Sequence, residues 1–285
     1  MNERQTTNNK LQTRMSYNLL KGKKGIVFGA LDEKSIAWQV ALKAHEEGAS
    51  LVLTNAPVAL RMGKIQELGK QVSAQVIPAD ATSIEELENL VNQSVEILGG
   101  KLDFVLHSIG MSMNVRKNKP YTDLNHEFML KTFDISAVSF HKLLQTCMKL
   151  DAVSEWGSVV ALSYIAAQRA FPGYNDMAES KALLESIARS FGYYYGEHKK
   201  VRVNTISQSP TQTTAGSGVK GFSDFFDYAA QMSPLGNATA ADCANCCVFL
   251  FSDLSRMITM QNIFHDGGFS STGMSGKLMA AGANK

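Results

Sequence analysis

The sequence predicts an α/β fold: a single Rossmann-like, doubly wound domain with a seven-stranded, mostly parallel sheet and helices on both faces. Short apolar, β-branched segments alternate with longer segments of helical periodicity almost from end to end. The short segments are apolar on both sides, as parallel strands between two helical layers must be. No internal repeat and no Gly/Ser/Pro-rich linker interrupts the alternation, so we expect one domain.

Seven segments have the length and composition of buried strands. In chain order they are 24–28, 51–53, 74–77, 102–107, 158–162, 202–206 and 262–265. The helices expected between them are 35–47, a stretch around 65–68, 83–98, one long helix over 124–150, 175–195, 222–232 and 240–251. Ser83 and Glu86 have the spacing of a capping box at the start of the third helix. Right-handed crossovers between these strands make the sheet doubly wound.

Composition limits the kind of partner. Of 285 residues, 45% are hydrophobic and 19% are charged, which excludes intrinsic disorder. The net charge of +2 provides no electrostatic case for nucleic acid. The longest apolar stretch, 246–251, is far shorter than the ~18 residues of a membrane span, so no membrane partner is expected.

The chain ends are expected to lie outside the folded domain. Residues 1–15 are polar and lack the apolar centre of a secretory signal, so we expect a disordered extension, then one domain over 16–275 and a flexible tail over 276–285. The four cysteines form no disulfide framework, which indicates a reducing, cytoplasmic location. Cys243, Cys246 and Cys247 lie on one helix face, where we expect core packing and no metal site.

Ligands of such folds bind at the carboxyl ends of the strands, near the point where strand order reverses. After the first expected strand, Gly29 would let the backbone approach a pyrophosphate. Ser35 either donates its hydroxyl there or is simply the N-cap of the next helix. After the third strand, Asp80 would either bond adenine or help to cap the following helix. The second strand is followed by no acidic residue, so preference for NAD over NADP is not determined there.

The fourth expected strand ends in His107-Ser-Ile-Gly110. Gly110 would allow close approach of a flat ring, and the backbone of Ser108 and Ile109 would line the cofactor. A single histidine at such a place is more often a packing residue than a ligand. We therefore expect no catalytic role for His107.

The strongest chemical signal is the pair Tyr174 and Lys181, seven residues apart and expected on one helix face. A tyrosine with a pKa of about 10 is a poor acid at neutral pH. An ammonium nearby favours the phenolate and is expected to lower the pKa of Tyr174. The same ammonium can bond the ribose hydroxyls of a nicotinamide cofactor. After the fifth strand of a doubly wound sheet, this pair indicates a nicotinamide-dependent enzyme.

Taken together, these motifs resemble the enoyl-[acyl-carrier-protein] reductases of the NADH type, a divergent branch of the short-chain dehydrogenase/reductase superfamily. The resemblance covers about 19–275 and depends on the extended turn from Gly29 to Ser35, on Tyr164 ten residues before Tyr174, and on the run His-Asp-Gly-Gly-Phe at 265–269. Ordinary ketoreductases of the superfamily carry a serine thirteen residues before the tyrosine. Here that position is Ala161.

The resemblance implies specific site residues. Tyr174 would bond the thioester carbonyl as it becomes an enolate, Lys181 would hold the nicotinamide ribose, and Tyr164 would shape the substrate pocket. The implied cofactor-binding residues are Gly29, Ser35, Ile36, Asp80, Ala81, Ser108, Ile109, Gly110, Lys181, Thr211 and Thr213. The implied substrate pocket, which includes a substrate-binding loop at about 210–234, is formed by Gly110, Ser112, Tyr164, Met177, Ala215, Val219 and Phe222.

The activity implied is reduction of the C2=C3 double bond of an enoyl thioester on acyl carrier protein, with NADH favoured over NADPH, by a homotetramer in fatty-acid biosynthesis. Around Lys220 the chain has a single cation where relatives often carry several for the acidic carrier; Arg116, Lys117 and Lys119 could replace them. Two alternatives remain: a short-chain reductase acting on a carbonyl, and a non-catalytic Rossmann protein that senses dinucleotide. Ala161 argues against the first alternative, and the intact Tyr174–Lys181 pair argues against the second.

Overall fold

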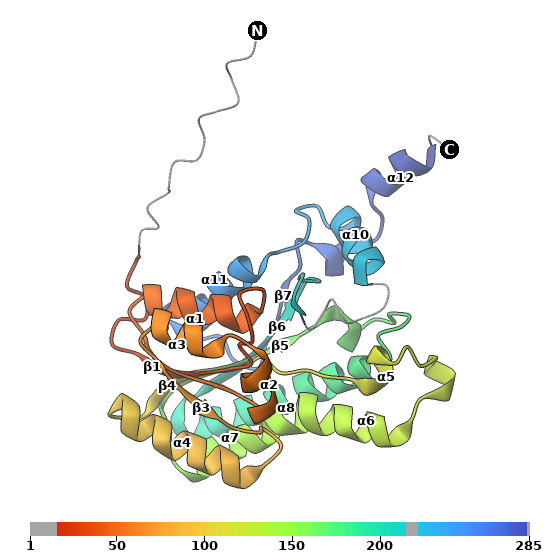
Figure 1. The fold of residues 1–285 in the computed structure, drawn as a ribbon. Coiled ribbons are helices and arrows are strands. Elements are labelled where there is room, and N and C mark those ends of the chain that lie inside the picture. The colour runs from red at the N-terminus through yellow and green to blue at the C-terminus, as the bar shows by residue number, and fades with distance from the viewer. Residues whose placement is uncertain (1–15, 215–221, 284–285) are drawn as a thin grey trace.

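Seven strands form one sheet in the order β3-β2-β1-β4-β5-β6-β7, and every neighbouring pair is parallel (Figure 1). The computed structural model describes residues 16–214 and 222–283. All seven predicted strands are present: β1 (Lys24–Phe28), β2 (Ser50–Asn55), β3 (Gln75–Pro78), β4 (Leu102–His107), β5 (Val153–Ser163), β6 (Arg202–Gln208) and β7 (Asn262–His265). The chain runs outward from β1 to β3 and then returns to the other side of β1 at β4. The predicted doubly wound α/β fold is confirmed, with the strand-order reversal between β1 and β4.

The helices form two layers. One face of the sheet carries α1 (Ile36–Glu46), α3 (Ile65–Gln71) and α11 (Ala240–Phe251); the other carries α4 (Ile84–Leu98), α7 (Ser139–Lys149) and α8 (Asp176–Lys199) (Figure 1). Each layer buries its own apolar cluster against the sheet, because both faces of a parallel sheet must be covered. In the first cluster the rings of Phe104 and Phe251 stack with centroids 4.4 Å apart. The remaining α-helices of the described residues are α2 (Pro57–Met62), α5 (Met113–Arg116), α6 (His126–Phe133), α10 (Phe222–Met232) and α12 (Gly276–Ala283).

The predicted long helix over 124–150 is divided by a π-helical turn. Helix α6 leads into the π-helical segment Asp134–Val138, which continues directly into α7. The wider turn aims two buried hydroxyls at the end of β4. The Ser136 hydroxyl accepts the Met111 N–H at 2.9 Å, and the Ser139 hydroxyl lies 2.8 Å from His107 Nε2. The irregularity, which side-chain periodicity did not reveal, thus coincides with hydrogen bonds to the end of β4 and to the loop that follows it.

Three further expectations concern the start of α4, the end of the chain and the α11 cysteines. The capping box at the start of α4 is half formed: Ser83 accepts the Glu86 N–H, but the Glu86 carboxylate accepts the N–H of Asp80. The segment expected to be a flexible tail contains α12, and the Ser275 hydroxyl before it donates to the Gln231 carbonyl of α10 at 2.6 Å. The α11 cysteines pack as predicted: Cys243 and Cys247 are fully buried in the core, and Cys246 is half-buried against it. The expected disordered extension, residues 1–15, lies outside the described residues.

Within 16–214 and 222–283, no helix has the length and apolar character needed to cross a bilayer. The start of the described chain is instead fastened to the domain by Glu47, a fully buried carboxylate at the end of α1. It accepts the backbone N–H groups of Tyr17 at 3.0 Å and Leu19 at 3.2 Å, and it pairs with Lys43 at 2.7 Å. Burial opposes ionisation, but the bonds from Lys43 and from the backbone outweigh it, so the pKa of Glu47 is lowered.

We therefore expect Glu47→Gln to lower the free energy of unfolding by about 1–3 kcal/mol near pH 7, because the half-buried Lys43 ammonium and the N–H groups of Tyr17 and Leu19 lose a charged acceptor. Since the folded-state pKa lies below the ordinary value of 4.5, this stabilisation is complete above pH 4.5 and is lost as the pH falls through the folded-state pKa. Urea unfolding at one fixed protein concentration measures the difference. The control is Glu46→Gln, whose half-exposed pair with Lys43 is expected to contribute under ~1 kcal/mol. Equal losses in the two variants would contradict the prediction.

Candidate active site

The site begins where the ends of β1 and β4 approach each other. Gly29 follows β1 with φ +102°, and a Cβ at this position would lie 2.0 Å from the carbonyl oxygen of Ser108. Only glycine fits, because any side chain would overlap the backbone after β4. The result is bare backbone at the strand-order reversal, where doubly wound folds bind their ligands.

The turn after Gly29 is held by Ser35 in a way that neither alternative anticipated. Ser35 is the N-cap residue of α1, but its hydroxyl makes no capping bond to the helix. It donates to the Asp32 carbonyl at 2.6 Å and accepts the Leu31 N–H at 3.1 Å. The hydroxyl therefore shapes the turn, and Ile36 begins the helix directly behind it.

Asp80 organises its own loop after β3. Its carboxylate accepts the N–H of Thr82 at 2.9 Å and the Thr82 hydroxyl at 2.8 Å, while its carbonyl accepts the N–H of Ser83, the N-cap of α4. Ala81 is buried in the core beside it. These contacts favour the loop-capping alternative for Asp80, with its backbone still at the carboxyl end of the sheet.

Gly110 lies next to Lys181 and Met177, two residues that the resemblance places in the cofactor site and the substrate pocket. A Cβ on Gly110 would lie 3.7 Å from Lys181 Nζ and 3.8 Å from Met177 Cε. Ile109, just before it, packs against the core. His107 is buried, with its ring 5.1 Å from that of Phe140, and burial together with the nearby Lys181 charge lowers the pKa of His107 to about 3. His107 is therefore a neutral packing residue.

Lys181 is buried and tethered. Its ammonium donates to the Leu162 carbonyl at the end of β5 at 2.7 Å. Burial lowers the pKa of Lys181 to about 8, and the charge of Glu185 opposes that shift. The ammonium therefore points at the carboxyl end of the sheet and stays charged at neutral pH.

Two expectations about Tyr174 are wrong. It lies two residues ahead of α8, followed by Asn175 with φ +46°, so it does not share a helix face with Lys181. Burial raises the pKa of Tyr174, the opposite of the expected direction. The physical reason is desolvation of the phenolate, while the Lys181 ammonium is bonded to the Leu162 carbonyl. The phenol therefore keeps its proton and can act as a hydrogen-bond donor.

Tyr164 and Tyr174 do come together, with ring centroids 5.0 Å apart. Phe171 packs edge-on against Tyr164 at 5.2 Å and also lies near Phe225 and Phe269. The three phenylalanine rings belong to the wall of a cavity of about 630 Å³ between the 165–172 loop, α10 and the segment after β7, lined by Ile165, Phe171, Phe225, Tyr228, Met232 and Phe269 among others. Its apolar lining suits an acyl chain. Sequence reasoning missed Phe171, Phe225 and Phe269; the signal was aromatic residues close to Tyr164 and in the expected substrate loop.

Ser112 was expected to line the substrate pocket, but the structure does not leave it at a surface. It is buried, and its hydroxyl donates to Asp176 at 2.6 Å and accepts the N–H of Val115. The other oxygen of the Asp176 carboxylate accepts Asn114 Nδ2 at 2.9 Å and the Thr132 hydroxyl at 2.8 Å. This network anchors the start of α8, two residues after Tyr174. Sequence reasoning missed Asp176. The available signal was an acidic residue two positions after Tyr174, together with the polar Ser-x-Asn segment at 112–114.

The segment after β6 lies across from the glycine turn. The Thr211 hydroxyl donates to the Ser209 carbonyl at 3.0 Å, and the Thr213 N–H donates to the Thr211 carbonyl at 2.7 Å. The Thr214 hydroxyl donates to the Asp32 carboxylate at 2.5 Å. Of the other predicted pocket residues, Ala215 and Val219 lie outside the described residues; Phe222 begins α10, but its side chain is not among those described.

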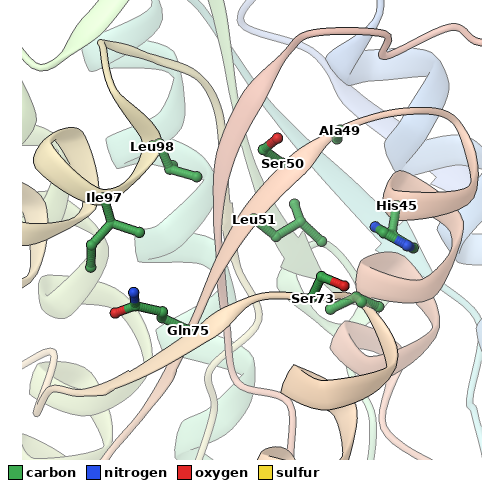
Figure 2. A pocket seen from close by; sticks show the side chains of 9 residues that line it. His45, Ala49, Ser50, Leu51, Ser73, Gln75, Ile97 and Leu98 are labelled. Carbon is green, nitrogen blue, oxygen red and sulfur yellow. The ribbon is translucent and has the colours of Figure 1, made fainter.

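A second cavity, of about 300 Å³, lies at the amino ends of the strands, the end of the sheet opposite to Tyr174 (Figure 2). It opens at the amino ends of β2 and β3, where His45, Ser50, Ser73 and Gln75 supply polar side chains and Ile97 and Leu98 supply apolar ones. None of the predicted site residues lines it. The chemistry is therefore expected at the Tyr174 end.

A doubly wound parallel sheet, a glycine turn after β1 and a tyrosine–lysine pair after β5 define a nicotinamide-dependent oxidoreductase of the short-chain type. A family model described as "Enoyl-(Acyl carrier protein) reductase" matches residues 29–270. The chain belongs to this family.

Known proteins agree with the assignment. The chain is 32% identical to an NADH enoyl-[acyl-carrier-protein] reductase of Rhizobium meliloti over 258 residues, which is 90% of this chain and 94% of that relative. It is also 32% identical to FabI of Aquifex aeolicus over 91% of this chain and 95% of the relative. Among solved structures, the FabI–NADH complex from Alistipes finegoldii superposes with a TM-score of 0.91 at 63% identity, covering 92% of each chain.

We expect Gly29→Ala to weaken NADH binding at least about tenfold and to lower the free energy of unfolding by about 1–3 kcal/mol, because the new Cβ forces β1 and β4 apart. Calorimetric titration with NADH and thermal unfolding measure the two effects. The matched control is Gly99→Ala: Gly99 also has positive φ, +65°, but no atom lies within 4 Å of its added Cβ. That variant is expected to lose about 1 kcal/mol and to bind NADH normally. Normal binding by the Gly29 variant would refute the assignment.

Proposed function

We infer that this chain reduces the C2=C3 double bond of an enoyl thioester with hydride from NADH, in fatty-acid biosynthesis. The observation that carries the inference is the contact between Tyr164 and Tyr174, with ring centroids 5.0 Å apart, in a site that also holds the buried Lys181. Family membership over residues 29–270 agrees with it. Catalysis is assigned to Tyr164, Tyr174 and Lys181.

The backbone at the strand-order reversal fits a dinucleotide. Gly29 leaves no side chain between the ends of β1 and β4, and Gly110 leaves space in front of Lys181. We assign cofactor binding to Gly29, Ser35, Ile36, Asp80, Ala81, Ser108, Ile109, Gly110, Lys181, Thr211 and Thr213, with Lys181 at the nicotinamide ribose. When bound, NADH supplies the hydride that C3 accepts.

Tyr174 acts on the charge that develops in the thioester. As C3 accepts hydride, negative charge moves to the thioester oxygen, and a phenol that keeps its proton can donate a hydrogen bond to it. Partial burial of Tyr174 favours this donor, because fewer water molecules compete for the oxyanion. Tyr164 packs against Tyr174 on one side and Phe171 on the other, and Phe171 lines the cavity where the acyl chain would lie. Overall, C3 gains hydride and C2 gains a proton.

The catalytic domain is assigned to residues 16–275, with a substrate-binding loop at about 210–234. We assign delivery of the enoyl chain to acyl carrier protein, with the carrier on the α5 side of the site. Arg116 and Lys117 are exposed there, and Asn175 beside Tyr174 donates to the Lys119 carbonyl at 2.7 Å. Helix α10 instead carries Asp224 and Asp227, which would repel an acidic carrier.

A carbonyl reductase is the other enzyme that this fold supports. Its alkoxide-forming chemistry uses a hydroxyl where this chain has Ala161, which is fully buried in the core. The hydroxyl-bearing residue that the resemblance assigns before Tyr174 is a tyrosine, Tyr164, three positions after the place of the ketoreductase serine. Both observations favour the enoyl substrate.

The substrate assignment predicts NADH oxidation with a crotonyl thioester and little with an acetoacetyl thioester. Tyr174→Phe is expected to lower kcat about 10²–10³-fold on the crotonyl substrate, because a single oxyanion donor is lost, while NADH affinity is retained. Stopped-flow absorbance of NADH measures the rates, and fluorescence titration measures the affinity. NADH oxidation with the acetoacetyl thioester but not with the crotonyl thioester would contradict the enoyl assignment.

A homotetramer in the cytoplasm is also proposed. Tyr193 and Tyr194 on α8 are 50% and 63% exposed, and Phe264 lies on β7, an edge strand of the sheet. Exposed aromatic side chains and a sheet edge are typical of subunit contacts. Sedimentation equilibrium is expected to give four times the mass of the chain, and Tyr194→Glu is expected to shift the population toward smaller species. A monomer for the unmodified chain would refute the tetramer.

A further inference from the structure

A second buried charge lies close to Lys181. Glu185 is 4% exposed and follows Lys181 by four residues on α8, on the same side of the helix. Its Oε1 accepts the Ser163 hydroxyl at 2.6 Å, and its Oε2 accepts Gln168 Nε2 at 3.0 Å. Burying a carboxylate is costly unless it is bonded on both oxygens, as it is here.

Both donors to Glu185 belong to the wall of the site. Ser163 lies between Leu162, whose carbonyl holds the Lys181 ammonium, and Tyr164. Gln168 ends the short 3-10 helix Ile165–Ala167, which leads to Phe171 and the apolar cavity. The carboxylate therefore ties α8 to the segment that supplies both the lysine tether and Tyr164.

The charge of Glu185 acts on Lys181 itself. Burial lowers the pKa of Lys181 to about 8, and Glu185 opposes the shift. The other titratable groups around Lys181 do not supply this negative charge. His107 of β4 is neutral, burial keeps Tyr164 and Tyr174 protonated, Asp176 is bonded by three donors, Asp266 faces Tyr164, and Asp134 of the π-helical segment pairs with Lys142.

We propose that Glu185 is a positioning residue for cofactor binding: through Ser163 it holds the tether of Lys181, and through its charge it keeps Lys181 an ammonium. The ligand class served is a dihydronicotinamide dinucleotide, whose ribose hydroxyls the ammonium donates to. The proposal rests on the ribose role assigned to Lys181. It does not depend on which acyl substrate the enzyme reduces.

The test is the affinity for NADH between pH 6 and pH 9, followed by ligand fluorescence with no thioester present. Lys181→Ala is expected to bind weakly across the whole range. Glu185→Gln removes the charge and keeps the size; its affinity is expected to match the unmodified chain at pH 6 and to fall on the order of 3–10-fold below it near pH 8, because Lys181 loses its proton at a lower pH. Glu185→Asp, which keeps the charge, is expected to restore the pH profile at least in part.

The control is Glu197→Gln, an exposed carboxylate on the same helix that is bonded to Tyr193. It is expected to leave the profile unchanged. An unshifted profile in Glu185→Gln, or an equal loss at every pH, would overturn the proposal, the second because it indicates a purely structural role. If Glu185→Gln does not fold, Ser163→Ala is the deciding variant, because it removes one hydrogen bond and keeps the Glu185 charge. A loss of NADH affinity at all pH values would support the tether, and unchanged affinity would overturn the proposal. Failure to reduce crotonyl thioesters would contradict the proposed function and leave this test intact.

Discussion

The molecule is organised around the close approach of β1 and β4. These central strands pair in parallel from Gly25–Phe104 to Phe28–His107, and immediately beyond them the backbone of Gly29 leaves no room for a Cβ beside Ser108. The two halves of the doubly wound sheet diverge from this pair. Because every strand ends at the same edge, loops far apart in sequence converge there, and the reversal of strand order leaves a ligand site between them.

Burial then decides the chemical state of the side chains at that edge. It keeps the Tyr174 phenol protonated, and it makes His107 neutral. It also lowers the pKa of Lys181 to about 8, a shift that the charge of Glu185 opposes, while the ammonium is bonded to the Leu162 carbonyl. The same low-polarity surroundings that strengthen a hydrogen bond to a developing oxyanion thus require a second buried charge to keep the cation.

Much of the fold followed from local patterns. The strands over 102–107 and 262–265 begin and end as predicted, because apolar runs bounded by turns leave little choice of register. The π-helical segment before α7 and the half-formed capping box at Ser83 were not predictable, since each depends on a hydrogen-bond partner distant in sequence or in a neighbouring loop. At the site, Gly110, Met177 and Lys181 were named from the resemblance, but neither their closeness to one another nor the burial of Ser112 could be predicted, because both depend on the packing of α8 against the loop after β4.

By itself, the sequence determined the α/β class, the order of strands and helices along the chain, and the glycine turn after β1, because periodicity and glycine placement act locally. Only the tertiary structure decided what those residues do. Tyr174 lies ahead of the helix and keeps its proton, Ser112 donates to Asp176, and Glu185 is bonded to Ser163 beside the Lys181 tether. The reason is physical: a pKa and a hydrogen bond depend on desolvation and on partners from other strands, and neither is written in residue spacing.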